Sequence, residues 1–178
     1  MKPAWPNMIN IFGCGRNVGK TTFACGLIKH LSTTHPIVAI KISPHFHNSE
    51  SELGILFKTE QYIISEETNS TSGKDTARMK SAGASKVFFI QCKDNGLKEA
   101  FEKLISYLPT QSPIVCESAS IQKIVNPGYS IKMIIPECDA NKNFDIKEDQ
   151  TVIFESNEFS IQPENFIFQH KLKLRTSI

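Results

Sequence analysis

The sequence predicts an α/β fold in three layers, with a mostly parallel sheet flanked by helices on both faces. Short apolar runs rich in β-branched residues alternate along most of the chain with segments whose apolar residues recur at helical spacing. Parallel strands need a long crossover connection, usually a helix, so this alternation favours a parallel sheet. A glycine-punctuated loop stands at the first strand-to-helix junction, where parallel sheets hold their ligands.

The apolar pattern predicts each element in turn. Helices are expected at residues 20–31, 75–82 and 97–108, and Gly83 and Pro109 mark the ends of the last two. A polar loop is expected at residues 68–73. Strands are expected at the short apolar runs 8–12, 36–42, 55–57, 62–64, 86–92, 113–116, 130–135, 151–154 and 166–168.

Length and composition are typical of a single globular domain covering residues 1–178. The chain is long enough to bury a substantial core, and it is 40% hydrophobic and 21% charged. A formal net charge of +2 gives no reason to expect nucleic acid as a partner. The amino-terminal residues lack the apolar run of a signal peptide and no stretch could span a bilayer, so no membrane contact is expected.

The five cysteines favour a reducing, cytoplasmic setting. Their total is odd, and their positions (14, 25, 92, 116 and 138) are scattered without a Cys-x-x-Cys pair. Cys92 and Cys116 end apolar runs, where reduced core thiols are common.

The stretch from Ile9 to Thr22 has the layout of a phosphate-binding P-loop, which narrows the predicted fold to that of P-loop NTPases. An apolar strand leads into a glycine loop, and Lys20 and Thr21 open an amphipathic helix. Glycines let backbone amides curl around an anion, and the helix N-terminus adds unpaired donors. The Lys20 ammonium can reach the outer phosphates, and the Thr21 hydroxyl suits a Mg²⁺ that also holds the nucleotide.

The loop is one residue longer than the common form, which has four residues between the first glycine and the Gly-Lys pair. Cys14 stands where that glycine is expected, so the match begins at Gly13 and spans five residues before Gly19. An ordinary glycine turn before a helix is the alternative. If the loop is a P-loop, the predicted nucleotide contacts are Gly13, Gly15, Asn17, Val18, Gly19, Lys20, Thr21 and Thr22.

Charged residues at the ends of later elements complete the predicted site. Glu117 directly follows the apolar run 113–116 and is the better candidate for holding Mg²⁺, and Asp75, at a helix start, is the second. Lys41 interrupts an apolar strand, where a lysine needs an anionic partner such as phosphate. The alternatives are a solvated Glu117, an Asp75 that only caps its helix, and a Lys41 that extends to the sheet edge.

The predicted roles divide between phosphate chemistry and metal binding. Lys20, Lys41 and Asp75 are predicted catalytic residues, while Thr21 and Glu117 are predicted to hold Mg²⁺. His45 and His47 have the spacing of a metal-binding pair, but no third ligand stands nearby in the sequence. Loop histidines in that situation are more often solvated or substrate-facing than metal-bound.

Four stretches of the chain follow one another in the order of a known family. They are residues 19–22, residues 39–45 (Ala-Ile-Lys-Ile-Ser-Pro-His), residues 73–84 (Gly-Lys-Asp-Thr-Ala-Arg-Met-Lys-Ser-Ala-Gly-Ala) and residues 115–118 (Val-Cys-Glu-Ser). Together they resemble the MobB family, the P-loop nucleotide-binding accessory proteins of molybdopterin guanine dinucleotide biosynthesis. The third stretch is the most specific, because its Gly-Lys-Asp and Ala-Gly-Ala keep the family's order and spacing.

The resemblance covers roughly residues 8–120, and it implies a domain that binds ATP or GTP with Mg²⁺ and hydrolyses it weakly. It also implies a homodimer that assists a cofactor-biosynthesis enzyme, with site positions at Lys20, Thr21, Lys41, Asp75 and Glu117. Ser118 replaces the family's glycine after the glutamate, and residues 120–178 show nothing that aligns.

The lengthened loop is similar to that of a second family, dethiobiotin synthetase, which uses Gly-x5-Gly-Lys-Thr, often with valine before the second glycine, as Val18 is here. That family also ends its second strand in a lysine and uses a glutamate after a later strand. Its reaction is the ATP-dependent carboxylation and ring closure of a diamine. The chain lacks that family's glycine-rich continuation after the glutamate, and residues 73–84 have no counterpart in it.

Three functions stay open from the sequence, which does not separate ATP from GTP. The favoured one is a Mg²⁺-dependent nucleotide hydrolase or accessory protein in cofactor assembly. The second is an ATP-dependent ligase or small-molecule kinase whose acceptor lies beside Lys41, His45 and His47. The third is a nucleotide-sensing binding module that switches a partner without catalysis.

Overall fold

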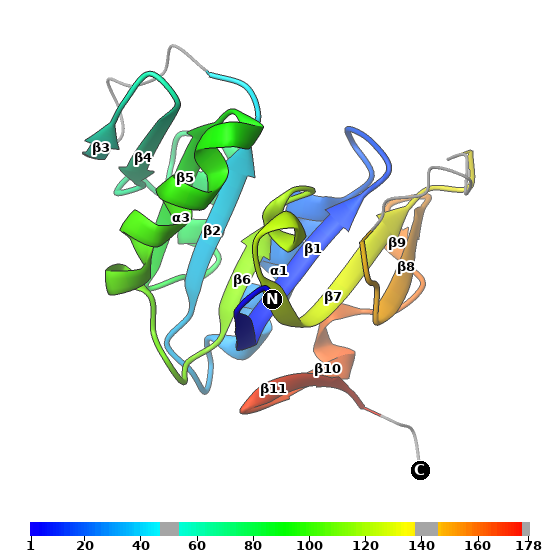
Figure 1. The fold of residues 1–178 in the computed structure, drawn as a ribbon. Helices are drawn as coiled ribbons and strands as arrows, with labels where there is room; N and C mark the ends of the chain where they lie inside the picture. Colours follow the sequence, from blue (N-terminus) through cyan, green and yellow to red (C-terminus); the bar gives the residue numbers. More distant parts are fainter. Residues whose placement is uncertain (47–53, 138–145, 176–178) are drawn as a thin grey trace.

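A nine-stranded sheet is the centre of the computed structural model, which describes residues 1–46, 54–137 and 146–175. The strands lie in the order β3-β4-β5-β2-β6-β1-β7-β8-β9, and β10 and β11 form a separate two-stranded sheet (Figure 1). Their bounds are β1 (Ala4–Gly13), β2 (Val38–Ser43), β3 (Gly54–Lys58), β4 (Tyr62–Glu66), β5 (Lys86–Cys92), β6 (Ile114–Glu117), β7 (Asn126–Ile134), β8 (Gln150–Glu155), β9 (Glu158–Phe159), β10 (Phe166–Gln169) and β11 (Lys171–Leu174).

The centre of the sheet is parallel, as the alternation of strands and helices predicted. The pairs β5–β2, β2–β6, β6–β1, β1–β7 and β7–β8 are all parallel. Antiparallel pairing is found at the two edges, where β3 pairs with β4, β4 with β5, and β8 with β9. β6 separates β1 from β2, so the strand that carries Lys41 and the strand that enters the glycine loop share β6 as their neighbour.

Helices cover both faces of the sheet. α1 (Lys20–Leu31) and α2 (Asp75–Ser81) share one apolar layer with the sheet, and α3 (Leu97–Leu104) packs in the layer on the opposite face (Figure 1). α1 has the predicted bounds, because its buried residues recur at helical spacing. Short 3-10 helices complete the described structure: η2 (Asp94–Gly96), η3 (Ile105–Tyr107), η4 (Ile121–Lys123) and η5 (Pro163–Asn165).

The carboxyl-terminal segment is part of the core on the α1 face. Phe166 is fully buried and its ring lies edge-on to Phe23 of α1, with 5.9 Å between ring centroids. Phe168 and Leu172, from β10 and β11, are buried in the same apolar layer. Residues 166–174 therefore close one end of that layer instead of forming a separate unit.

Several element bounds differ from the prediction. The third helix ends at Leu104 and continues as the 3-10 helix η3, and β7 begins at Asn126 instead of residue 130. β9 and β11 were not predicted. β9 has two residues and contains no apolar run. β11 alternates lysine with leucine, which is the pattern of a half-buried strand, so the sequence contained a signal for it that was not used.

The oxidation state of the cysteines agrees only in part with the reducing setting predicted from the sequence. Cys92 and Cys116 are buried and free, as expected of core thiols, and Cys25 is also free. Cys14, by contrast, is disulfide-bonded, which the reducing setting inferred from the scattered cysteines did not predict. Pairing depends on the distance between two side chains in the fold, which spacing along the chain does not reveal.

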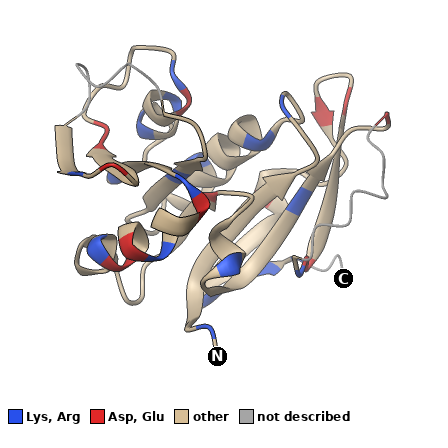
Figure 2. Ribbon diagram, turned by 45° about the horizontal axis from the view of Figure 1, so that its top comes forward, with Lys and Arg blue, Asp and Glu red and all other residues tan. Residues whose placement is uncertain are grey.

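Charged residues of both signs are interspersed along the ribbon (Figure 2). This distribution agrees with the nearly neutral formal charge of +2. Among the helices of the described segments, none is both long enough and apolar enough to cross a membrane.

Candidate functional site

A cavity of about 590 Å³ opens at the carboxyl ends of β1, β2 and β6. Parallel sheets hold their ligands at this end, because the loops that follow the strands converge there. The described residues that line the cavity are Arg16, Asn17, Gly19, Lys20, Thr21, Thr22, Lys41, Ser43, His45, Asp75, Arg78, Glu117 and Phe154.

The glycine loop, residues 13–19, forms one wall of this cavity. Gly19 has a φ of 78° and Asn17 a φ of 60°, so the chain twice enters the left-handed region before α1 begins at Lys20. The first turn of α1 contains no acidic residue, and Gly19 provides no side-chain cap. The positive end of the helix dipole and its unpaired amides are therefore not neutralised from within the helix.

The structure separates the predicted nucleotide contacts into two groups. Gly13 lies against β7, where an added Cβ would approach the carbonyl oxygen of Met133 to 2.3 Å. Val18 is buried in the core, and Gly15 lies outside the cavity lining. The predicted contacts that line the cavity are Asn17, Gly19, Lys20, Thr21 and Thr22.

Lys20 folds back over the glycine loop. Its ammonium donates a hydrogen bond to the carbonyl oxygen of Gly15, and its side chain lines the cavity. Burial lowers the pKa of Lys20, although the nearby carboxylates of Glu117 and Asp75 act in the opposite direction. A burial cost of this kind is relieved when an anion approaches the ammonium.

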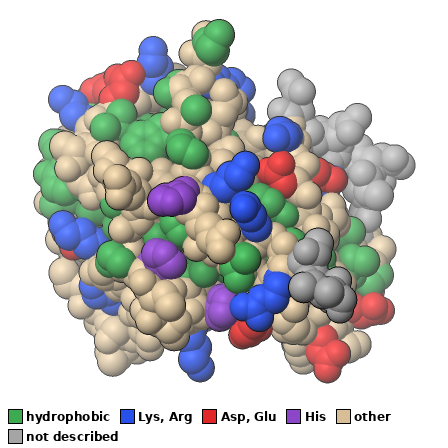
Figure 3. All heavy atoms as spheres, turned by 90° about the horizontal axis from the view of Figure 1, so that it is seen from below, with side chains coloured by type: hydrophobic (Ala, Val, Ile, Leu, Met, Phe, Trp, Pro, Cys, Tyr) green, Lys and Arg blue, Asp and Glu red, His purple; other side chains and the backbone are tan. Residues whose placement is uncertain are grey.

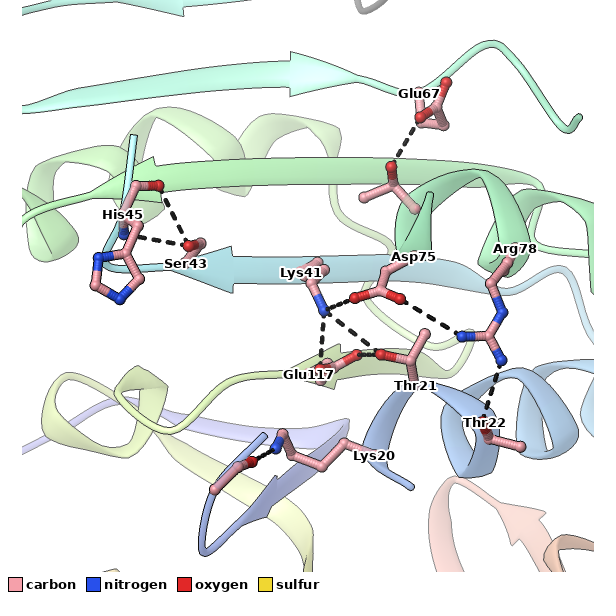
Figure 4. Close-up of polar contacts among 12 residues, drawn as sticks. Lys20, Thr21, Thr22, Lys41, Ser43, His45, Glu67, Asp75, Arg78 and Glu117 are labelled. Atoms are coloured by element: carbon pink, nitrogen blue, oxygen red, sulfur yellow. Dashed lines mark hydrogen bonds and ion pairs between the residues drawn. The ribbon is translucent and has the colours of Figure 1, made fainter. Parts of the chain in front are cut away.

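Lys41 lies at the centre of a network of polar side chains in the cavity and contacts both of its carboxylates (Figure 4). Its Nζ lies 2.7 Å from Oδ2 of Asp75 and 2.9 Å from Oε1 of Glu117. The Thr21 hydroxyl donates a 2.7 Å hydrogen bond to the other oxygen of Glu117. The network therefore joins β2, β6, α1 and α2 at the point where each of them enters the site.

Arg78 closes this network into a ring. From α2, its Nη2 lies 3.1 Å from Oγ1 of Thr22, and its Nη1 lies 3.5 Å from Oδ1 of Asp75 (Figure 4). Arg78 thus links the first turn of α1 to α2 on the side away from Lys41. The sequence contained a signal for Arg78, because it stands three residues after Asp75 on the same helix.

The charges in the ring shift the pKa values of its members. Burial acts against the charged form of Lys41, but Glu117 and Asp75 outweigh it, and the pKa of Lys41 is raised. Burial likewise acts to raise the pKa of Asp75, but the hydrogen bond and charge of Lys41 outweigh that effect, and its pKa is lowered. Both groups are therefore held in their charged forms at neutral pH.

The oxygen atoms around Thr21 fit a magnesium ion that shares its shell with phosphates and water. The Thr21 hydroxyl donates its hydrogen bond to Glu117 and accepts a 3.5 Å hydrogen bond from Nζ of Lys41, so one lone pair of its oxygen is left for a cation. The described residues contain no cluster of three or more His, Cys, Asp or Glu that could hold a metal by itself. Mg²⁺ does not require one, since it is usually bound through one or two carboxylates together with substrate phosphates.

The structure distinguishes between the alternative placements predicted for Lys41, Asp75 and Glu117. Lys41 points into the network and not to a sheet edge. Asp75 is the first helical residue of α2, and Lys74 is the N-cap, so the Asp75 carboxylate does not act as the cap. Glu117, the last residue of β6, is buried and paired, not solvated.

The predicted histidine pair is not supported as a metal-binding part of the site. His45 is exposed, and its backbone amide and carbonyl form hydrogen bonds with the Ser43 hydroxyl at the mouth of the cavity. His47 lies outside the described residues. The histidine pair is therefore without structural support as a metal site.

Ser43 lines the cavity just after β2, where the carboxyl-end rule places ligands, but Arg16 and Phe154 were not predicted as cavity residues. Phe154, on β8, packs against Phe159 with ring centroids 4.9 Å apart, and both rings contact the position of Gly19. The β8–β9 hairpin thus covers one side of the glycine loop. No local motif could reveal this, because about 135 residues separate the hairpin from the loop it covers.

A second cavity, of about 530 Å³, lies at the opposite end of the sheet. It is lined by His35, Gln111, Ser112, Phe168, Gln169 and His170, and Figure 3 shows this end with histidine side chains on its surface. None of these lining residues is acidic or carries a lysine or arginine charge. The cavity at the glycine loop is therefore the stronger candidate for phosphate chemistry.

No protein family, curated protein or solved structure matches the chain. The resemblances to the MobB family and to dethiobiotin synthetase stay predictions from sequence motifs, and the site is interpreted from its own geometry.

Proposed function

We propose that this chain has a P-loop NTPase fold and binds a nucleoside triphosphate with Mg²⁺ in the cavity at residues 13–22. One observation carries the proposal: the glycine loop, Lys20 and the Thr21–Glu117 hydrogen bond meet in one cavity at the carboxyl ends of parallel strands. Backbone amides at the start of α1 and the Lys20 ammonium provide the donors that a chain of phosphates requires.

Each residue of the ring has a role in this proposal. Thr21 holds Mg²⁺ through its hydroxyl oxygen, and Glu117 orients that hydroxyl and holds water around the ion. When bound, Mg²⁺ neutralises charge on the phosphate oxygens. Lys41, kept charged by two carboxylates, is the second cation of the site, and Asp75 holds it in place.

Slow hydrolysis is the activity that this arrangement supports best. A general base must be free to accept a proton, but Lys41 engages both carboxylates of the cavity. Their engagement leaves neither carboxylate free to activate water, which supports slow hydrolysis. Together with the resemblance to the MobB family, this favours a weak ATP or GTP hydrolase or accessory protein in cofactor biosynthesis.

A second candidate is a ligase or kinase that transfers phosphate to a small acceptor. The observation in its favour is the reach of the cavity, which extends past Lys41 to Ser43 and His45 at the end of β2. An acceptor bound there would lie in the same cavity as Lys20, at the end of β2. Turnover that requires an added acceptor would separate this candidate from the first.

Calorimetric titration with ATP, GTP, ADP and GDP, with and without Mg²⁺, tests the proposal. We expect binding that Mg²⁺ strengthens, and a loss of about tenfold or more in Lys20→Ala, because a charge-assisted contact to phosphate is removed. Lys29→Ala is the control, since Lys29 is an exposed lysine of the same helix. Failure to bind any of the four nucleotides would refute the proposal, while binding without phosphate release would leave a nucleotide-sensing module.

A further inference from the structure

A buried carboxylate lies outside the ring, at the base of the loop that leads to Asp75. Glu67 follows β4, and only 1% of its surface is exposed. Its Oε2 accepts a 2.7 Å hydrogen bond from the Thr76 hydroxyl (Figure 4). Its Oε1 accepts a 2.9 Å hydrogen bond from the backbone amide of Asn69. Burying a carboxylate is costly, so these two hydrogen bonds are strong constraints on the groups that make them.

These contacts fix both ends of the loop between β4 and α2. The amide of Glu67 donates to the carbonyl oxygen of Val87, which attaches the start of the loop to β5. Thr76 lies in the first turn of α2 and is itself buried, so its bond to Glu67 attaches the end of the loop to the same place. The loop between β4 and α2 is therefore attached to the sheet at β5, and this attachment positions the start of α2 beside the cavity.

Asp75 depends on this anchor because it has little packing of its own. Its side chain is 44% exposed and sits at the first position of a seven-residue helix. Such a short helix is not stable without tertiary contacts. Thr76 is the adjacent residue, and the position of its backbone determines whether the Asp75 carboxylate reaches Lys41.

We propose that Glu67 is a positioning residue of the site, which acts through Thr76 to hold the Asp75 carboxylate on the Lys41 ammonium. The geometric part of this inference stands without a ligand. Only its consequence for affinity rests on the proposed nucleotide function. Glu67 itself does not line the cavity, so it is not a catalytic residue.

A matched pair of substitutions at Thr76 tests the inference. Thr76→Val removes the hydroxyl at nearly constant size, whereas Thr76→Ser keeps it. The readout is the ¹H–¹⁵N signal of the Lys41 ammonium, which is observable only while hydrogen bonds slow its exchange with water, and which Lys41→Met identifies by its disappearance. We expect Thr76→Ser to keep the wild-type signal and Thr76→Val to change it in the same way as Asp75→Asn.

A double variant distinguishes positioning of the Asp75 carboxylate by Thr76 from a general loss of order in α2. If Thr76 acts through Asp75, adding Thr76→Val to Asp75→Asn changes the Lys41 signal no further. An unchanged signal in folded Thr76→Val, or full additivity in the double variant, overturns the inference. If Thr76→Val does not fold, Glu67→Met replaces it. Methionine removes both hydrogen-bond acceptors at a similar size, so the Lys41 signal is expected to change as it does in Asp75→Asn, and an unchanged signal in the folded variant overturns the inference.

The affinity for nucleotide provides a second readout that depends on the proposed function. We expect Thr76→Val to weaken binding of the nucleotide with Mg²⁺ by about tenfold, as is typical for the loss of an outer hydrogen bond that orients a site. Thr76→Ser should bind like wild type. A wild-type protein that binds no nucleotide would refute the proposed function, but the Lys41 signal would still decide the role of Glu67.

Discussion

The ammonium of Lys41 lies 2.9 Å from Oε1 of Glu117, and the two residues face each other in register on the adjacent strands β2 and β6. Side-chain exposure is only 18% for Lys41 and 8% for Glu117. An ion pair in such surroundings adds little net stability, because both charges lose water. Removing one partner is nevertheless costly, since the other charge stays buried alone.

Lys41→Met is therefore expected to lower the free energy of unfolding by about 3 kcal/mol. Urea denaturation at neutral pH measures the loss. Lys98→Met is the matched control, because Lys98 pairs with Glu102 across 3.9 Å on the exposed face of α3, with 77% of its side chain exposed. Lys98→Met is expected to lower the free energy of unfolding by less than about 0.5 kcal/mol. Equal costs for the two variants would show that the Lys41–Glu117 pair is not effectively buried.

The lowered pKa of Asp75 predicts a stability change in acid. A carboxyl whose pKa is lower in the folded state stabilises that state above its ordinary pKa of 3.8, and this contribution disappears as the pH falls below that value. Asp75→Asn should therefore be less stable than wild type at neutral pH, by less than about 1 kcal/mol because the side chain is partly exposed. The difference should vanish at low pH in urea titrations between pH 2 and pH 7, and a difference that grows in acid would contradict the prediction.

Local motifs were sufficient to predict the central part of the molecule. The apolar run before Gly13, the helical spacing after Lys20 and the β-branched run before Lys41 each produced the expected element. Glu117 and Lys41 could also be selected, because each charge stands at the end of a run that otherwise reads as a buried strand. What the sequence did not contain was their pairing, which follows from the strand order β2-β6-β1.

The extra length of the glycine loop could be seen in the sequence, but its reason could not. Gly13 appeared as a P-loop glycine one position too early, whereas in the structure it is required by the close approach of β7. This approach joins residues more than a hundred positions apart, so no local pattern reveals it. Phe154 was missed for a related reason, since only the folded chain brings it to the glycine loop. Arg16 lies within the loop itself, so the sequence contained a signal for it that was not used.

Gly19→Ala is predicted to damage both the fold and the site. Gly19 has a φ of 78°, and an added Cβ would lie 2.8 Å from the ring of Phe154. The left-handed backbone alone costs a non-glycine residue about 1–2 kcal/mol, and displacement of the β8–β9 hairpin adds to it. Thermal unfolding and nucleotide titration measure the two effects.

Gly15→Ala is the control for that substitution. Gly15 lies in the same loop, has no positive φ, and an added Cβ would meet nothing within 4 Å. We expect its free energy of unfolding to stay within about 0.5 kcal/mol of wild type. If both alanine variants were equally stable, the left-handed turn at Gly19 would not be a constraint on the loop.

Phe166→Ala tests whether the carboxyl-terminal segment belongs to the core that supports the site. Phe166 is fully buried against Phe23 of α1, the helix whose first turn contains Lys20 and Thr21. Truncating a buried phenylalanine costs about 3–5 kcal/mol through lost transfer energy and the cavity it leaves. Ile153→Ala, on the partly exposed face of β8, should cost less than about 1.5 kcal/mol. Because α1 begins at the glycine loop, a loosened helix should also weaken nucleotide binding in Phe166→Ala. Wild-type stability in this variant would mean that residues 166–174 do not support α1.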